Sequence, residues 1–178
     1  MIIGPMFSGK TTSLIEIIKQ NKCMNSLSIN YLKNNRYGTN ENITHTGIPI
    51  ETTYKVITEN LNDIILSEEF LYYKNSELII IDECQFYSDI YSFVINAIEN
   101  DNKPIICAGL NGDSNKNLFG NLFELIPHVD EIKFLKAKCE CGNDAIFSKR
   151  IISTQEQILI GEKDLYKAVC RKCYKSNL

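Results

Sequence analysis

The strongest constraint on the fold of this chain is an eight-residue motif that begins at its fourth residue. The motif matches G-x-x-x-x-G-K-[S/T] at every required position, with an apolar run before it and apolar residues at helical spacing after it. Glycines allow backbone angles that let successive amides converge on phosphate oxygens, and a helix N-terminus adds unpaired N–H groups. The sequence therefore predicts a nucleotide-binding loop between a strand and a helix over about residues 9–21. The residues of the loop are Gly4, Pro5, Met6, Phe7, Ser8, Gly9, Lys10 and Thr11.

Two carboxylates that could complete this site follow an apolar run. Residues 78–81 read LIII, which is typical of a strand buried on both faces of a parallel sheet. Asp82 comes next and is the candidate to support magnesium together with Thr11, while Lys10 reaches the β- and γ-phosphates of a nucleotide. Because adjacent strand residues point to opposite sides, we expect Glu83 to face a second substrate and accept a hydroxyl proton. An ATPase would use such a glutamate to orient water, and a solvated loop acid is a further alternative.

The order of the remaining segments predicts an α/β fold, a P-loop parallel sheet flanked by helices. We expect strands over 27–32 and 104–108, helices over 56–66 and 89–99, and a long loop over 33–50. Only three residues precede Gly4, which predicts a short first strand and a frayed sheet edge.

Short strand-like segments dominate from residue 131 onward. They cover residues 132–137, 145–151 and 157–160. We therefore expect a boundary near residue 138. Residues 1–138 would form the P-loop nucleotide-binding α/β domain, and residues 139–178 a small zinc-binding β subdomain.

Four of the seven cysteines form two close pairs in this C-terminal part. Cys139, Cys141, Cys170 and Cys173 would supply four thiolates, which suit a closed tetrahedral zinc site. The first pair is one residue shorter than the usual C-x-x-C, so its turn must be tighter. Disulfides are the alternative reading of the cysteines, and a nucleic-acid-binding zinc ribbon is the alternative function. An odd cysteine count without a secretion signal favours a reducing compartment, so we expect a cytoplasmic protein.

Composition excludes several classes of protein. The 178 residues carry 19 Lys+Arg and 22 Asp+Glu, a net charge of -3, and 44% of the residues are hydrophobic. Such a chain is neither disordered nor strongly basic, so we expect no dedicated nucleic-acid binding. No apolar run approaches the roughly 20 residues that a membrane span needs, so we expect no membrane partner.

Together, the motifs make the chain resemble the type II thymidine kinase family, the cytosolic kind, over nearly its whole length. The resemblance implies transfer of the γ-phosphate of ATP to the 5′-hydroxyl of thymidine, giving TMP for DNA precursor synthesis. It also implies magnesium, a structural zinc and a homotetramer. The matching stretches are residues 5–10 (PMFSGK), 35–37 (NRY), 81–83 (IDE) with 85–86 (QF), 147–150 (FSKR), 160–161 (IG) with Tyr166, and 169–174 (VCRKCY).

The same resemblance implies roles for individual residues. Glu83 becomes the general base, Asp82 the second support of the metal, and Arg36 a cation beside the phosphates, with an ordinary surface arginine as the alternative. A lasso over the base corresponds to Gln157, Ile158, Leu159, Ile160 and Gly161, with Tyr166 closing the pocket. Apolar pocket positions, for which plain core packing is the alternative, are Met6, Phe86, Leu110 and Phe119.

The chain departs from the family pattern in the stretch after residue 109. A family Leu-Asp-Gly-x-Phe stretch reads LNGDS over residues 110–114, which puts Ser114 where a pocket aromatic is expected. Cys84 also stands where the family has a small residue. Loss of the aromatic removes apolar surface from the pocket and could loosen base selectivity. Two alternatives therefore stay open: a kinase for another deoxynucleoside, and a P-loop nucleotide switch whose zinc ribbon binds nucleic acid or a protein.

Overall fold

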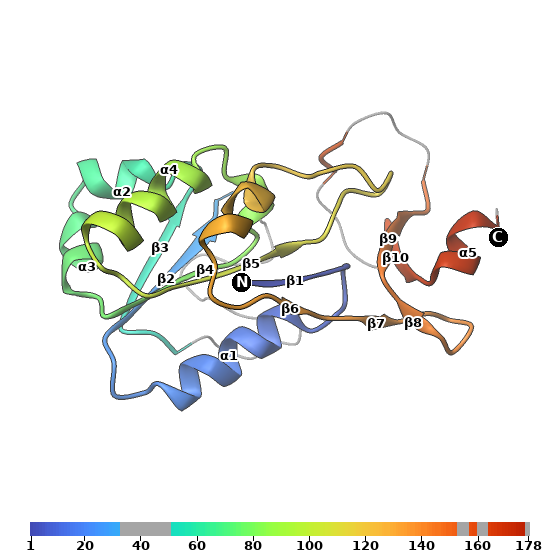
Figure 1. Ribbon diagram of the computed structural model, residues 1–178, viewed down its shortest axis with the longest axis horizontal. Helices are drawn as coiled ribbons and strands as arrows, with labels where there is room; N and C mark the ends of the chain where they lie inside the picture. The colour runs from blue at the N-terminus through green and yellow to red at the C-terminus, as the bar shows by residue number, and fades with distance from the viewer. Residues whose placement is uncertain (33–50, 153–156, 160–163, 177–178) are drawn as a thin grey trace.

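A six-stranded parallel sheet forms the centre of the molecule (Figure 1). The computed structural model describes residues 1–32, 51–152, 157–159 and 164–176. Every neighbouring pair in the sheet is parallel, in the order β3-β2-β4-β5-β1-β6. This confirms the predicted α/β class. The strands are β1 (Ile2–Gly4), β2 (Ser26–Tyr31), β3 (Tyr54–Thr58), β4 (Leu78–Ile81), β5 (Ile105–Leu110) and β6 (Lys133–Phe134).

Helices cover both faces of this sheet, which is why the strands are apolar on both sides (Figure 1). On one face α1 packs Leu14 and Ile18 against Ile80 of β4, and on the other Ile79 and Ile81 join the larger core cluster. The last turn of the segment predicted as a helix over 89–99 is a π-helical turn. The helices are α1 (Lys10–Gln20), α2 (Asn62–Leu66), α3 (Phe70–Asn75) and α4 (Ile90–Ile95), with 3-10 segments η1 (Cys84–Phe86) and η3 (Leu122–His128) and the π-helical η2 (Asn96–Asn100).

The first strand is short, as predicted, but it does not lie at a frayed edge. Ile2 pairs with Ala108 of β5 on one side and with Lys133 of β6 on the other. The backbone N–H groups of Lys133 and Leu135 donate to the carbonyls of Met1 and Ile3. β1 is therefore hydrogen-bonded on both sides, and this pairing fixes the strand that leads into the predicted nucleotide-binding loop.

The helix predicted over residues 56–66 was wrong in its first half. Residues 54–58 form β3, which pairs in register with β2, and α2 begins only at Asn62. Val56 is buried while its neighbour Ile57 is 39% exposed, the alternation of an edge strand. Two β-branched residues next to an available sheet edge favoured the strand over the local helical pattern. The segment predicted as a loop over 33–50 lies outside the described residues.

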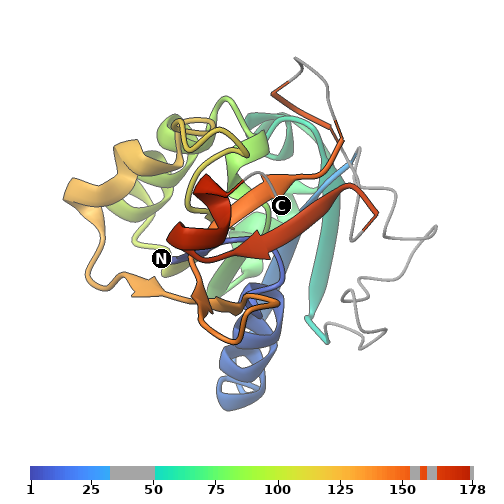
Figure 2. The ribbon, with the colours of Figure 1, turned by 90° about the vertical axis from the view of Figure 1, so that its right-hand side faces the viewer.

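Two small antiparallel sheets and a last helix form the C-terminal part (Figure 2). The predicted strand over 132–137 is divided between β6 and β7, and that over 145–151 between β8 and β9. Residues 157–159 form no strand, contrary to prediction, while residues 166–169 form one that the sequence analysis did not anticipate. The elements are β7 (Ala137–Lys138), β8 (Asp144–Ala145), β9 (Phe147–Arg150), β10 (Tyr166–Val169) and α5 (Arg171–Lys175).

Division of the chain into domains at residue 138 stays a prediction, and the two predicted parts are in direct contact. The backbone N–H of Met6 donates to Ser148 Oγ of β9 at 2.9 Å. In the residues that the structure describes, no helix has the length and apolar character needed to cross a membrane.

Candidate active site and metal centre

The predicted nucleotide-binding loop joins the end of β1 to the start of α1. Its backbone takes left-handed angles at Phe7 (φ 63°) and Gly9 (φ 82°). A Cβ atom on Gly4 would lie 2.5 Å from the carbonyl oxygen of Leu135, so only glycine fits there. Lys10 is buried at the helix start, and its Nζ donates to the carbonyl of Pro5 at 2.9 Å and of Gly4 at 3.3 Å. The loop thus has the curled backbone that its glycines predict.

A hydrogen bond joins this loop to the end of β4. Thr11 Oγ1 donates to Asp82 Oδ2 at 3.0 Å, and the N–H of Glu83 donates to Asp82 Oδ1 at 2.8 Å. Burial and the nearby Glu83 raise the pKa of Asp82 to about 6, against the opposing effects of the Glu83 amide, Lys10 and Thr11. The structure therefore brings together the hydroxyl and the carboxylate predicted to support magnesium. A hydroxyl and a carboxylate oxygen are the oxygen ligands that magnesium prefers.

Glu83 reaches its position by backbone geometry rather than by strand alternation. β4 ends at Ile81, and Glu83 has a left-handed backbone with φ 54° and ψ 40°. Gln85 Nε2 donates to Glu83 Oε2 at 2.6 Å, and Gln85 Oε1 accepts the N–H of Leu110 at 3.0 Å. The buried Gln85 thus ties the Glu83 carboxylate to the end of β5. Gln85 belongs to the matching stretch 85–86 but had no predicted role. A glutamine two residues after the acid was a usable signal for a side chain that binds the carboxylate of Glu83.

Three aromatic side chains lie together next to Glu83. The ring of Phe86 stacks on Tyr31 at 4.9 Å between centroids and meets the ring of Phe119 edge-on at 5.5 Å. Phe86 and Phe119 were predicted pocket residues, while Tyr31 was not. Of the other two predicted positions, Leu110 is bound through its amide to Gln85, and Met6 lies in the nucleotide-binding loop beside β9. Phe86 and Phe119 are therefore in ring contact, while Leu110 is the last residue of β5 and Met6 lies two residues after the end of β1.

The described part of the predicted lasso, residues 157–159, is held by side chains from β9 and β10. Arg150 Nη2 donates to the carbonyl of Gln157 at 3.0 Å, and Tyr166 Oη donates to that of Leu159 at 2.7 Å. Arg150 also donates to Tyr166 Oη through Nε at 3.2 Å and Nη2 at 2.9 Å. Gln157 and Ile158 are exposed. The predicted site residues Arg36, Ile160 and Gly161 lie outside the described residues.

The four paired cysteines come together, as predicted from their spacing. All four are free thiols, and their sulfur atoms lie within 4.8 Å of one another. A zinc ion bound tetrahedrally at about 2.3 Å would separate its sulfur ligands by about 3.8 Å, so the cluster fits zinc. The shortened pair closes through a tight turn in which the N–H of Gly142 (φ 86°) donates to the carbonyl of Cys139 at 2.8 Å.

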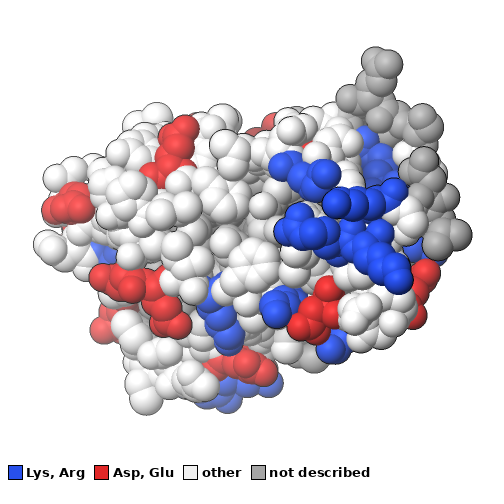
Figure 3. Space-filling view, turned by 45° about the vertical axis from the view of Figure 1, so that its right-hand side comes forward, with Lys and Arg blue, Asp and Glu red and all other residues white. Residues whose placement is uncertain are grey.

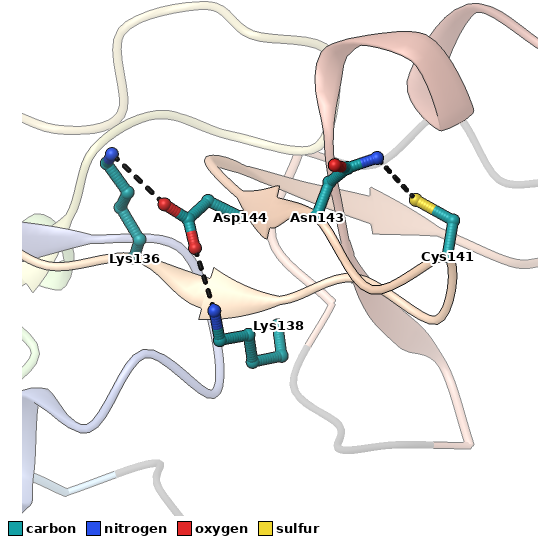
Figure 4. Close-up of polar contacts among 5 residues, drawn as sticks. All are labelled: Lys136, Lys138, Cys141, Asn143 and Asp144. Carbon is teal, nitrogen blue, oxygen red and sulfur yellow. Dashed lines mark hydrogen bonds and ion pairs between the residues drawn. The ribbon is translucent and has the colours of Figure 1, made fainter.

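A polar network surrounds this turn (Figure 4). Asn143 Nδ2 donates to Cys141 Sγ at 3.3 Å, and hydrogen bonds from the backbone and side chain of Asn143 lower the pKa of Cys141 to about 6. Asp144 bridges Lys136 at 3.2 Å and Lys138 at 3.0 Å, which joins β7 to β8. These contacts favour the thiolate form that a zinc ligand needs and hold its hairpin.

Comparison with known proteins assigns the family. A family model described as thymidine kinase matches residues 1–174. The chain belongs to the thymidine kinase family. It is 42% identical to the thymidine kinase of Sheeppox virus (strain KS-1) over 98% of this chain and 94% of the viral one. Identity to the thymidine kinase of Amsacta moorei entomopoxvirus is 38%, over 99% and 97% of the two chains. The thymidine kinase of Oryza sativa subsp. japonica is 35% identical over 98% of this chain, which spans 65% of the rice protein. These findings confirm the family indicated by the sequence motifs.

Replacement of Asp82 by asparagine is expected to change how stability depends on pH. The folded-state pKa of Asp82 is raised, so the folded chain holds this proton more tightly than the unfolded chain does. The resulting stabilisation is complete below about pH 4 and is lost as the pH rises through 6. Without added magnesium, Asp82→Asn should therefore gain stability over the wild type between pH 4 and 7, by about 1–3 kcal/mol above pH 7.

Urea unfolding across this pH range measures the effect. Asp144→Asn is the matched control, because contacts with Lys138 and Lys136 lower the pKa of Asp144, whereas the pKa of Asp82 is raised. The change of stability with pH should therefore have the opposite sign. That variant should lose stability relative to the wild type as the pH rises from acid to neutral. If the free energy of unfolding of Asp82→Asn differed from that of the wild type by the same amount at every pH, the raised pKa of Asp82 would be contradicted.

The cysteine cluster is expected to hold about one zinc ion per chain. Elemental analysis of the purified protein measures this content, and Cys173→Ser should lower it and reduce the thermal midpoint, because a structural zinc stabilises only the folded state. Cys23→Ser is the matched control, since Cys23 is an exposed cysteine outside the cluster. A folded wild-type protein without zinc, or equal zinc content in both variants, would rule the site out.

Proposed function

We propose that this chain is a thymidine kinase that transfers the γ-phosphate of ATP to the 5′-hydroxyl of thymidine, with magnesium as cofactor. One observation carries the proposal: Thr11 and Asp82 meet at 3.0 Å beside the loop, and the next residue, Glu83, turns out of the strand direction. This arrangement supports a phosphate site with an acid beside it that could accept a proton. The chain's membership of the thymidine kinase family supports thymidine as the acceptor.

In the proposed complex, the loop from Gly4 to Gly9 binds the phosphates of ATP through backbone N–H groups. Pro5 has no N–H group and the N–H of Met6 donates to Ser148 Oγ, so the donors would come from the other residues of the loop. Lys10 exchanges its loop carbonyls for phosphate oxygens, and Arg36 would neutralise charge on the phosphate side. Thr11 and Asp82 would hold magnesium, which supplies positive charge to the phosphate oxygens when bound. The contribution of the protein is then positioning and electrostatic stabilisation.

Glu83 is the proposed general base for the 5′-hydroxyl. Gln85 donates to one of its carboxylate oxygens, which orients the carboxylate that would accept the hydroxyl proton. The base of thymidine would lie between the aromatic group of Phe86 and Phe119 and the segment 157–159. Tyr166 would support that segment through the carbonyl of Leu159.

We further propose a structural role for zinc at Cys139, Cys141, Cys170 and Cys173, where four protein ligands close the coordination shell. The helix α5 begins at this site, because Cys170 Sγ accepts the N–H of Cys173 at 3.5 Å. A homotetramer in the cytoplasm is proposed on the family resemblance alone, and gel filtration with light scattering would measure its size.

The second candidate is a nucleotide switch that binds nucleic acid or protein through the zinc-binding part. Lysine and arginine side chains gather on that side of the molecule (Figure 3). Lys116 Nζ lies 4.4 Å from the ring centroid of Tyr174, and Arg171 Cζ lies 5.0 Å from the ring centroid of Phe147. Lys149 donates to the carbonyls of Tyr174 and Ser176. These cations already serve internal contacts, which favours the kinase.

Incubation with labelled ATP and a panel of nucleosides tests the two candidates. We expect phosphate transfer to thymidine and its analogues, with transfer to other deoxynucleosides reporting how far Ser114 loosens base selectivity. Slow hydrolysis without transfer to any nucleoside, together with salt-dependent nucleic-acid binding, would favour the switch instead.

Replacement of Glu83 by glutamine should lower kcat by about 10²–10⁴-fold, because glutamine cannot accept the proton. Glutamine keeps the size of the side chain, so the thermal midpoint and the affinity for ATP should stay close to those of the wild type. Gln85→Glu is a companion variant that places a second acid against Glu83 and should also lower kcat. Near-normal turnover in Glu83→Gln would refute the assigned role.

A further inference from the structure

A buried carboxylate outside the nucleotide site joins two segments that are far apart in the sequence. Asp113 lies in the loop after β5 and is 6% exposed. Its Oδ1 accepts the backbone N–H groups of Asn115 and Asn117, each at 2.8 Å, and its own N–H donates to the carbonyl of Asn117 at 3.0 Å. The loop therefore holds the carboxylate in one orientation.

The other oxygen of this carboxylate binds the segment 157–159. Gln157 Nε2 donates to Asp113 Oδ2 at 2.9 Å and to the carbonyl of Leu118 at 3.3 Å. The carbonyl of Gln157 accepts from Arg150, so this residue is held by its side chain and by its backbone. Ordering a glutamine side chain costs conformational entropy, which the two hydrogen bonds of Gln157 Nε2 offset.

The charge of Asp113 strengthens this contact. Burial acts to raise the pKa of Asp113, but hydrogen bonds from Gln157, Asn117 and Asn115 together lower it below its usual value. The carboxylate is ionised at neutral pH, and a hydrogen bond to an ionised acceptor is roughly twice as strong as a neutral one.

The loop that carries Asp113 is also anchored on its other side. Tyr174 Oη of α5 donates to the carbonyl of Ser114 at 2.7 Å. Ser114 stands where the family pattern has a pocket aromatic, and in this chain a hydrogen bond to its carbonyl holds the loop at that position. The loop can therefore act as a fixed support for the segment 157–159.

We propose that Asp113 is a positioning residue that holds Gln157, and with it the segment 157–159, in the orientation that binds the nucleoside. This inference rests on the proposed function, because it assigns that segment to the nucleoside side of the site. Asp113 is 30 positions from Glu83 in the sequence. It is given no role in phosphate transfer itself, yet it would set the affinity for the acceptor.

A charge-exchange experiment tests the contact. Gln157→Glu places a second carboxylate against Asp113, and we expect KM for thymidine to rise about 10–100-fold while KM for ATP stays unchanged. In the double variant Asp113→Asn with Gln157→Glu, the new amide can donate to the new carboxylate. The double variant should recover at least about threefold of this rise in KM, short of the wild type because the Leu118 carbonyl has lost its donor.

The alternative is that Asp113 only stabilises its own loop. In that case Asp113→Asn would add to the effect of Gln157→Glu, and the double variant would bind thymidine no better than Gln157→Glu. That result, or a parallel rise in KM for ATP, would overturn the proposal. Asp130→Asn is the matched control, since it makes the same charge change at an exposed position, and should leave both constants unchanged.

A separate readout distinguishes failure of this inference from failure of the proposed function. If the wild type transfers phosphate to no nucleoside, the function is wrong, and hydrogen exchange of the amides at 157–159 still measures the contact. Exchange should be faster in Gln157→Glu and slower again in the double variant. Equal exchange in the three proteins would show that Asp113 does not hold the segment.

Discussion

The hydrogen bond from Thr11 to Asp82 is the interaction on which the candidate site depends. It joins the start of α1 to the end of β4, across 71 positions of sequence, and it does so at a carboxylate that is 3% exposed. Burying that carboxylate beside a second acid costs free energy, which Lys10, Thr11 and the Glu83 amide only partly offset. A sheet that carries such a cost in its centre is organised around binding rather than around stability.

Different contacts hold the two segments that this bond joins, the predicted nucleotide-binding loop and the residues after β4. The nucleotide-binding loop is shaped by its own backbone and by the narrow space between Gly4 and Leu135. The Glu83 side chain is oriented by the left-handed backbone of this residue and by a hydrogen bond from Gln85, which also binds β5. The proposed base and the proposed phosphate site thus follow β4 and β1, which lie on either side of β5 in one sheet, an arrangement that suits a reaction that depends on alignment.

Much of this could be predicted from the sequence, because the motifs that carry it are local. The loop, the apolar strand before Asp82 and the four cysteines each contain their own signal. The helix predicted over 56–66 was wrong because the edge of β2, which a local pattern does not report, selected a strand at Val56. Strand β10 and the contact of Asp113 with Gln157 were missed for the same reason, since each depends on partners 16 or more residues away.

The bond between the Met6 amide and Ser148 Oγ has a consequence for how the chain can be divided. One of the amides of the predicted nucleotide-binding loop takes its acceptor from β9, in the C-terminal part that carries the four cysteines. Removing that part would leave a donor of the loop without its protein acceptor, and any shift of β9 would move the loop with it. The shape of the loop at residues 4–11 therefore depends on β9 as well as on the sequence of the loop. A copy of residues 4–11 placed in another protein would lack the hydroxyl group that accepts the Met6 N–H.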